Sequence, residues 1–313
     1  MSGNAKMDTA RCSRTLRRLF GALALASVLL PCLAYGPDVR AQETIGLNNH
    51  VLGIGNCPPW NAQALEVCYN SLERVVEALS PRLDAGPDNL HLLINEGASA
   101  SALKLKATEL ANRLGAQDRL IIYANLPLGQ LEGDQTEEEN GFVLEFWAEE
   151  KPETAASAIS DGIWITAPAF AAILHTIPAA EVILILDTND SYAVNMHLLD
   201  RHSVDHEDRP EALVSSAGDG QSANYSADRT ISLFAKHLAL ALRETEGSLH
   251  DVMSVAVSGT RQSAIPICAT LKEHQGETVE QVADCLQVPQ IHDPDALLAE
   301  TLLLPIPENG PKE

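Results

Sequence analysis

The residues best placed for chemistry follow an apolar segment in the middle of the chain. Residues 182–186 are all apolar, which is typical of a strand that is buried on both faces of a parallel sheet. Ligands bind beyond the carboxyl ends of such strands. The segment that follows offers the polar side chains of Asp187, Asn189, Asp190 and Ser191. It contains no cysteine and no histidine, so the nucleophile expected at such a position is missing. An equally weighted interpretation is that Asp187 ends the strand and accepts hydrogen bonds from the next turn.

A second group of candidates is rich in metal-binding side chains. His197, His202 and His206 lie among four carboxylates within a dozen residues. Their intervals of five and four residues suit only a partly helical loop, and basic residues and a proline interrupt it. The sequence therefore favours a solvated charged loop, with a metal site as the alternative.

Motifs for other reaction classes are incomplete. Ser258 precedes a glycine but lacks the first glycine of a G-x-S-x-G turn, and Gly53 and Gly55 lack the third glycine of a dinucleotide-binding loop. We therefore expect neither a serine hydrolase site nor a bound nucleotide, and we predict no cofactor.

The first 41 residues have the pattern of a secretory signal peptide. Four arginines precede the apolar run 19–30, and residues 39–41 offer small residues at a cleavage-site spacing. The run is shorter than the roughly 20 residues of a membrane-spanning helix. We expect signal residues 1–41, a mature chain that starts near Gln42, and a periplasmic or secreted location.

The mature chain is strongly acidic. Loss of residues 1–41 removes six of 21 Lys+Arg and two of 43 Asp+Glu, so the formal charge changes from −22 to −26. Nucleic acid and anionic membrane surfaces are therefore poor partners for this chain.

Four cysteines remain after residue 41, which suits disulfide bonds in an oxidising compartment. The sequence allows three pairings. We favour Cys57 with Cys68 and Cys268 with Cys285, because each pair is close in sequence and flanks one helix-like segment.

Strand and helix patterns alternate through the mature chain. Apolar strands are expected at 51–54, 90–94, 120–123, 182–186 and 212–215. Helical periodicity is expected at 65–79, after a cap at Ser99 or Ser101, after a cap at Thr166, and at about 227–243, 248–257, 277–286 and 294–303. This order predicts a three-layer α/β/α sandwich with a mainly parallel central sheet, in one domain over 42–313 with a C-terminal helical extension from about residue 268.

The order of these segments resembles the caspase-like cysteine peptidases, including metacaspase-type members. The similar segments are His50-Val-Leu-Gly-Ile-Gly55, the helix at 65–79 with Asn70, Asp118-Arg-Leu-Ile-Ile-Tyr-Ala124, Leu184-Ile-Leu-Asp-Thr-Asn-Asp-Ser191, Val214-Ser-Ser-Ala-Gly218 with 221–223, and Arg261-Gln262 with Pro266. The resemblance implies the family's α/β/α fold and a cleft where strands 120–123 and 182–186 end.

Both catalytic positions depart from the family pattern. The family's histidine corresponds to Leu126 and its cysteine to Asn189, so the resemblance implies no catalytic residue here. By the same resemblance, Asp187 belongs to the acidic pocket that recognises a basic residue in metacaspase-type members. Together with Asn125, the polar residues at 187–191 form the expected binding cleft.

The sequence thus predicts an exported pseudoprotease that binds a peptide or protein and regulates it without cleavage. One alternative is a peptidase of the same class with relocated catalytic residues or a metal-assisted site at His197, His202 and His206. The other is a structural adaptor without a functional cleft.

Overall fold

The computed structural model describes residues 46–57, 59–60, 62–131, 141–196, 209–275 and 285–307. These residues belong to one compact unit, Gly46–Glu313. No helix within these described ranges is long and apolar enough to cross a membrane.

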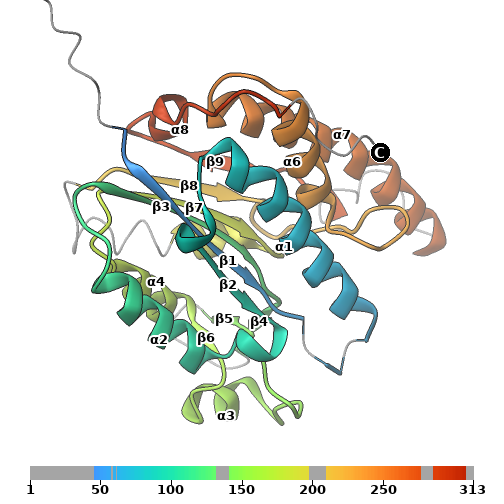
Figure 1. Cartoon of the computed structure of the whole chain (residues 1–313). Coiled ribbons are helices and arrows are strands. Elements are labelled where there is room, and N and C mark those ends of the chain that lie inside the picture. The colour runs from blue at the N-terminus through green and yellow to red at the C-terminus, as the bar shows by residue number, and fades with distance from the viewer. Residues whose placement is uncertain are drawn as a thin grey trace, which may run out of the picture. The chain divides into compact units, whose positions relative to one another are not determined.

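A six-stranded sheet forms the centre of the molecule (Figure 1). Its order is β2-β1-β3-β7-β8-β9. The strands are β1 (Asn48–Gly55), β2 (Leu90–Ile94), β3 (Asp118–Asn125), β7 (Glu181–Asp187), β8 (Glu211–Ser215) and β9 (Gln290–His292). The first five are mutually parallel, and β9 runs antiparallel to β8. All five strands that the sequence predicts are therefore confirmed in one sheet.

Helices cover both faces of this sheet, which confirms the predicted α/β/α sandwich. One face packs against α1 (Ala62–Arg82), α6 (Leu233–Glu244), α7 (Leu249–Gln275) and α8 (Leu297–Glu300). The other packs against α2 (Ala100–Ala111) and α4 (Ala167–His175), which begin at the N-caps Ser99 and Thr166.

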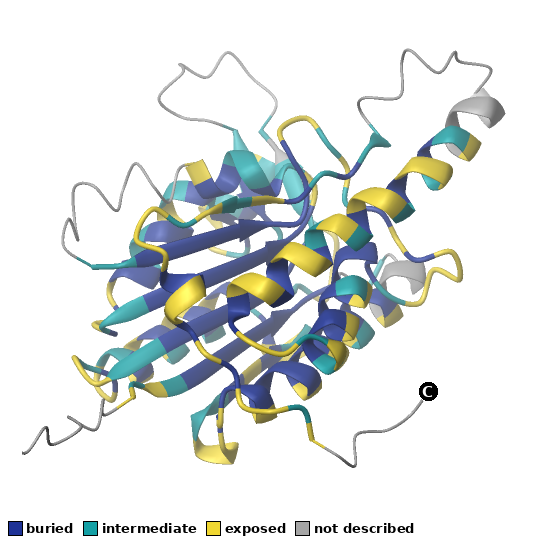
Figure 2. Ribbon diagram, turned by 90° about the horizontal axis from the view of Figure 1, so that it is seen from above, coloured by how far each residue is buried: buried dark blue, intermediate teal, exposed yellow. Residues whose placement is uncertain are grey.

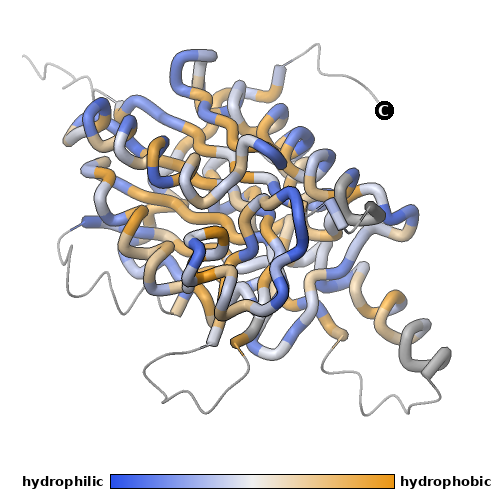
Figure 3. Tube along the Cα trace, turned by 90° about the horizontal axis from the view of Figure 1, so that it is seen from below, coloured by the Kyte–Doolittle hydropathy of each residue, from blue (hydrophilic) through white to orange (hydrophobic). Residues whose placement is uncertain are grey.

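The two cores follow from the alternation of side chains along a strand. In β3, Leu120 and Ile122 face α2 and α4, whereas Ile121 and Tyr123 face α1 and α6. The strands are buried along most of their length in Figure 2, and Figure 3 shows apolar residues along them, with polar residues in many of the surrounding loops.

Smaller elements complete the fold. A three-stranded antiparallel sheet contains β4 (Leu128–Gln130), β5 (Phe142–Leu144) and β6 (Ile165–Thr166). The short helices are α3 (Ala155–Ser160), η1 (Pro87–Asn89) and η2 (Asn95–Gly97). None of these was expected from periodicity, because two- and three-residue strands are too short to show a period of two.

The chain after residue 268 differs from the expected helical extension. Helix α7 continues to Gln275, past Pro266, and the later segment adds strand β9 to the central sheet. The helix expected at 277–286 lies largely outside the described residues. Only four residues of the one expected at 294–303 are helical, in α8.

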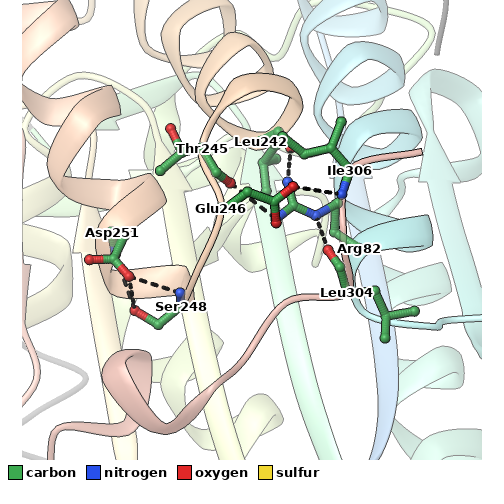
Figure 4. A network of polar contacts seen from close by, with 8 residues as sticks. All are labelled: Arg82, Leu242, Thr245, Glu246, Ser248, Asp251, Leu304 and Ile306. Carbon is green, nitrogen blue, oxygen red and sulfur yellow. Dashed lines mark hydrogen bonds and ion pairs between the residues drawn. The ribbon is translucent and has the colours of Figure 1, made fainter. Parts of the chain in front are cut away.

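A buried arginine joins the last described residues to the helices. Arg82, only 1% exposed, donates through Nε to the Leu304 carbonyl at 2.5 Å, through Nη2 to the Thr245 carbonyl at 3.0 Å, and through Nη1 to that of Leu242 (Figure 4). Glu246 pairs with the same guanidinium at 3.7 Å and accepts from the Ile306 amide. Two carbonyls at the end of α6 and one carbonyl of the last described segment thus share one cation.

Two disulfides confirm the favoured pairing. The Cα atoms are 5.6 Å apart in Cys57–Cys68 and 5.2 Å apart in Cys268–Cys285. Such bonds fit a protein of the periplasm or the extracellular space.

We expect replacement of both Cys268 and Cys285 by alanine to lower the free energy of unfolding by about 3 kcal/mol, because the bond restricts the unfolded chain. Urea denaturation measures the loss. Non-reducing peptide mapping of the unmodified protein checks the pairing. Free thiols, or a bond between Cys57 and Cys268, would contradict it.

Candidate functional site

Three neighbouring strands end together at one edge of the sheet. Gly55 of β1 pairs in register with Asn125 of β3, which in turn pairs with Asp187 of β7. The strand order reverses between β1 and β3, because β2 lies on one side of β1 and the later parallel strands lie on the other. Such a reversal is the usual place for a ligand in an open parallel sheet.

A pocket of about 390 Å³ lies at these strand ends. Its walls come from the ends of β3 and β7, from the segments that follow β1, β3, β5, β7 and β8, and from α1 and β4. The lining residues are Cys57, Trp60, Cys68, Asn125, Leu126, Pro127, Leu128, Glu145, Lys151, Asp187, Thr188, Asn189, Ala223, Tyr225 and Ser232.

Asp187 is the most buried acid in this pocket, with 2% of its surface exposed. Its Oδ2 accepts hydrogen bonds from the Tyr123 hydroxyl at 2.8 Å, from Asn125 Nδ2 at 3.0 Å and from the Ser232 hydroxyl. Its other oxygen, Oδ1, has no hydrogen-bond donor within the described part of the chain. Burial raises the pKa of Asp187 above its usual value, although these donors oppose the rise.

The environment of Asp187 also perturbs its neighbours. Burial and the carboxylate raise the pKa of Tyr123 well above that of a free phenol, so Tyr123 remains a hydrogen-bond donor. Burial likewise raises the pKa of Glu145, which also lines the pocket, and Lys151 opposes that rise. The pocket therefore holds two carboxyl groups in partly dehydrated surroundings, and the exposed Lys151 also lines it.

Only some of the predicted cleft residues line the pocket. Asp187, Asn125 and Asn189 do, and Asn189 Oδ1 accepts from the Ala223 amide at 2.7 Å. Asp190 lies outside, in a left-handed backbone conformation with φ of 48°. Ser191 is fully buried and exchanges hydrogen bonds with the backbone of Ala217. Ser191 thus holds the turn after β7 against the segment that follows β8.

Leu126 and Asn189, which the sequence resemblance aligns with a catalytic histidine and cysteine, both line this pocket. Leu126 is 2% exposed and packs in the core beside α2 and α4. Asn189 is exposed and held by the Ala223 amide. Neither side chain can act as a thiol nucleophile or as a proton-transfer group.

Several residues that contact Asp187 or line the pocket were missed by the sequence reasoning. Tyr123 could have been found, because it lies two positions before Asn125 and so shares a face of β3 with it. Ser232 carries no such signal, since it reaches Asp187 from 45 residues later in the chain and also caps α6. The disulfide Cys57–Cys68 was expected, but its place in the pocket wall was not.

The candidates for relocated chemistry lie elsewhere. His197, His202 and His206 are outside the described residues. Among the residues that are described, no group of three or more His, Cys, Asp or Glu side chains could hold a metal ion. His237 Nε2 lies 2.9 Å from Ser263 Oγ between α6 and α7, but His237 Nδ1 faces Gly259 rather than an orienting carboxylate. We therefore interpret the His237–Ser263 hydrogen bond as a contact between two packed helices.

Comparisons with known proteins give a fold but no family. No family model matches the chain, and no curated protein matches it. The structure is similar to the crystal structure of protein GSU0716 from Geobacter sulfurreducens, with a TM-score of 0.54, 14% identity, and coverage of 82% of this chain and 100% of that one. It also matches caspase-1 from Spodoptera frugiperda, with a TM-score of 0.40, 12% identity, and coverage of 79% and 88%. The first match shows that the two proteins share a fold.

Proposed function

We propose that this protein is an exported, caspase-like pseudoprotease that binds a peptide segment in the pocket at Asp187 and does not cleave it. The buried Asp187 carries the proposal. Its Oδ1 lacks a donor among the described residues, and a buried carboxylate oxygen without a partner is costly. An ammonium, guanidinium or amide group of a ligand would satisfy it.

The absence of cleavage follows from the residues at the two catalytic positions. A cysteine peptidase needs a thiolate to attack the carbonyl and a histidine to protonate the leaving amine. Asn189 and Leu126 supply neither group. All four cysteines after residue 41 are in disulfides, so the mature chain offers no free thiol.

Export is proposed from the leader and the disulfides together. The pattern at residues 1–41 is that of a signal peptide, and two disulfides are typical of the compartments that such a leader reaches.

A peptide-binding assay tests the proposed function by comparing the protein with a variant that lacks the charge of Asp187. Fluorescein-labelled hexapeptides with lysine, arginine, glutamine or glutamate fixed at one position are titrated with the protein, and fluorescence anisotropy reports binding. We expect the basic and amide peptides to bind, and Asp187→Asn to weaken the basic ones by about tenfold or more. Asp190→Asn is the matched control, since it makes the same chemical change three residues later and outside the pocket.

The proposed alternatives predict other results in the same assay. A structural adaptor without a functional cleft would bind none of these peptides, or would bind them independently of Asp187. A peptidase with relocated catalytic residues would release fragments that mass spectrometry detects.

Peptide binding should also depend on pH through Asp187. A basic peptide needs the ionised carboxylate, so affinity should fall as the pH is lowered. Because burial raises the pKa of Asp187, the fall should begin at a higher pH than for an ordinary exposed aspartate. Anisotropy titrations between about pH 8 and pH 4 measure this, and Asp187→Asn should remove that part of the dependence. An unchanged pH profile in the variant would assign the effect to another group.

A further inference from the structure

A second hollow adjoins the pocket at Asp187. It has a volume of about 680 Å³, and two of its lining residues, Ala223 and Tyr225, also line that pocket. It lies between the loop 223–229 and helices α6 and α7. The two hollows therefore meet along one stretch of chain.

The loop between the hollows is held in place from both sides. The Ala223 amide donates to Asn189 Oδ1, and the Asn224 amide donates to Gln287 Oε1 at 2.8 Å. The Asn224 carbonyl accepts from the Leu233 amide at the start of α6. A fixed wall of this kind makes the second hollow a preformed extension of the first.

The floor of the second hollow is mainly apolar. Leu233 of α6 and Pro266 and Ile267 of α7 contribute to it, and Tyr225 at the shared edge is 44% exposed. An aliphatic side chain of a ligand would remove this surface from water.

Two cations stand beside this apolar floor. Arg229 and Lys236 both line the hollow and are exposed, and neither has a carboxylate partner within the ranges that the structure describes. Arg229 sits in a left-handed turn, with its amide donating to the Ser226 carbonyl at 2.8 Å. The nearby Asp228 does not line the hollow, and its Oδ1 accepts from Ser226 and Thr230. In a chain of net charge −22, two such cations favour an anionic group.

We propose that this hollow is a second subsite for the same peptide, and that it selects an aliphatic residue next to an aspartate or glutamate. The inference rests on the proposed function, because the occupant continues from the pocket at Asp187 along the loop 223–229. The aliphatic side chain packs on Leu233 and Ile267, while the carboxylate pairs with Arg229 and Lys236.

The experiment uses the same protein and two labelled peptide series. Each peptide keeps the residue that the Asp187 pocket prefers. In the first series, a leucine–glutamate pair is moved one position at a time along the peptide, on either side of the residue that binds at Asp187. The second series is identical except that glutamine replaces glutamate. We expect one register of the glutamate series to bind best, and this preference to fall as salt is added.

Charge-reversal variants then test whether the second hollow causes the preference for glutamate. Arg229→Glu with Lys236→Glu should weaken the best glutamate peptide by about tenfold and abolish the preference for glutamate over glutamine. The control is Lys104→Glu with Arg113→Glu, which makes the same change in net charge within α2 and just after it, on the other side of the sheet. Circular dichroism confirms that each variant is folded.

The outcomes separate the two proposals. Binding that depends on Asp187 but shows no preference for glutamate, or keeps that preference after charge reversal at 229 and 236, overturns the second subsite and leaves the proposed function standing. No binding of any peptide overturns both. Equal loss in the control at 104 and 113 would show a general charge effect and also overturn the subsite.

Discussion

Arg82→Met is expected to lower the free energy of unfolding by about 3 kcal/mol. Methionine keeps most of the aliphatic stem but removes every donor. The carbonyls of Leu242, Thr245 and Leu304 would then lose the guanidinium that they share. A buried acceptor without a partner costs about 1–3 kcal/mol, and hydrogen bonds to a charged donor are among the stronger ones.

The ion pair contributes less to this loss. Glu246 is 61% exposed and lies 3.7 Å from Arg82, so water replaces much of that interaction. Glu246→Gln should therefore cost well under half as much as Arg82→Met. The comparison separates the buried hydrogen bonds from the surface charge pair.

Urea denaturation measures both variants against Arg113→Met, an exposed arginine on the opposite side of the sheet. Hydrogen exchange should show faster exchange at Leu304 and Ile306, whose amides donate to the Arg82 carbonyl and to Glu246. A loss no larger than that of Arg113→Met would show that the last described residues hold their place without the arginine.

Asn189→Cys is expected to give no measurable peptidase activity. The new thiol would lie in the pocket, but its partner position holds Leu126, which cannot remove or deliver a proton. In enzymes of this type the nucleophile and base act as a unit, and the absence of either costs several orders of magnitude. The single variant should therefore remain as inactive as the unmodified protein.

Adding Leu126→His tests whether the two positions are a degenerate catalytic pair. Only the double variant should show slow turnover that iodoacetamide blocks, and its introduced thiol should be alkylated faster than that of the single variant. The turnover should be weak, because position 126 is 2% exposed and an imidazole there is largely dehydrated. Peptide mapping must first show that the new cysteine has not exchanged with the disulfide Cys57–Cys68 in the same pocket wall.

Cleavage assays on the unmodified protein test the pseudoprotease proposal most directly. Peptide cleavage that thiol reagents inhibit would refute the pseudoprotease, since residues 42–313 contain no free thiol. Cleavage that resists thiol reagents but stops with a chelator would instead favour the metal-assisted alternative at His197, His202 and His206.

Local pattern alone predicted five of the six strands of the central sheet and favoured the observed disulfide pairing. The strand at 182–186 is a continuous apolar run, and such a run needs cover on both faces. Cys57 and Cys68 flank a short segment, so their pairing needed little information from the rest of the chain. Ser99 and Thr166 cap their helices through an amide only three residues away.

The tertiary structure decided which side chains meet. Strand register places Gly55, Asn125 and Asp187 in one row, and register depends on pairing between distant segments. It also turned Ser191 into the protein interior and brought Ser232 to Asp187, although Ser191 is the nearer residue in sequence. Strand β9 exists because β8 offers it a free edge, which three residues of sequence cannot reveal. Hydrophobic periodicity reports the face that a residue occupies, whereas a binding pocket is made by long-range contacts between loops that carry no period.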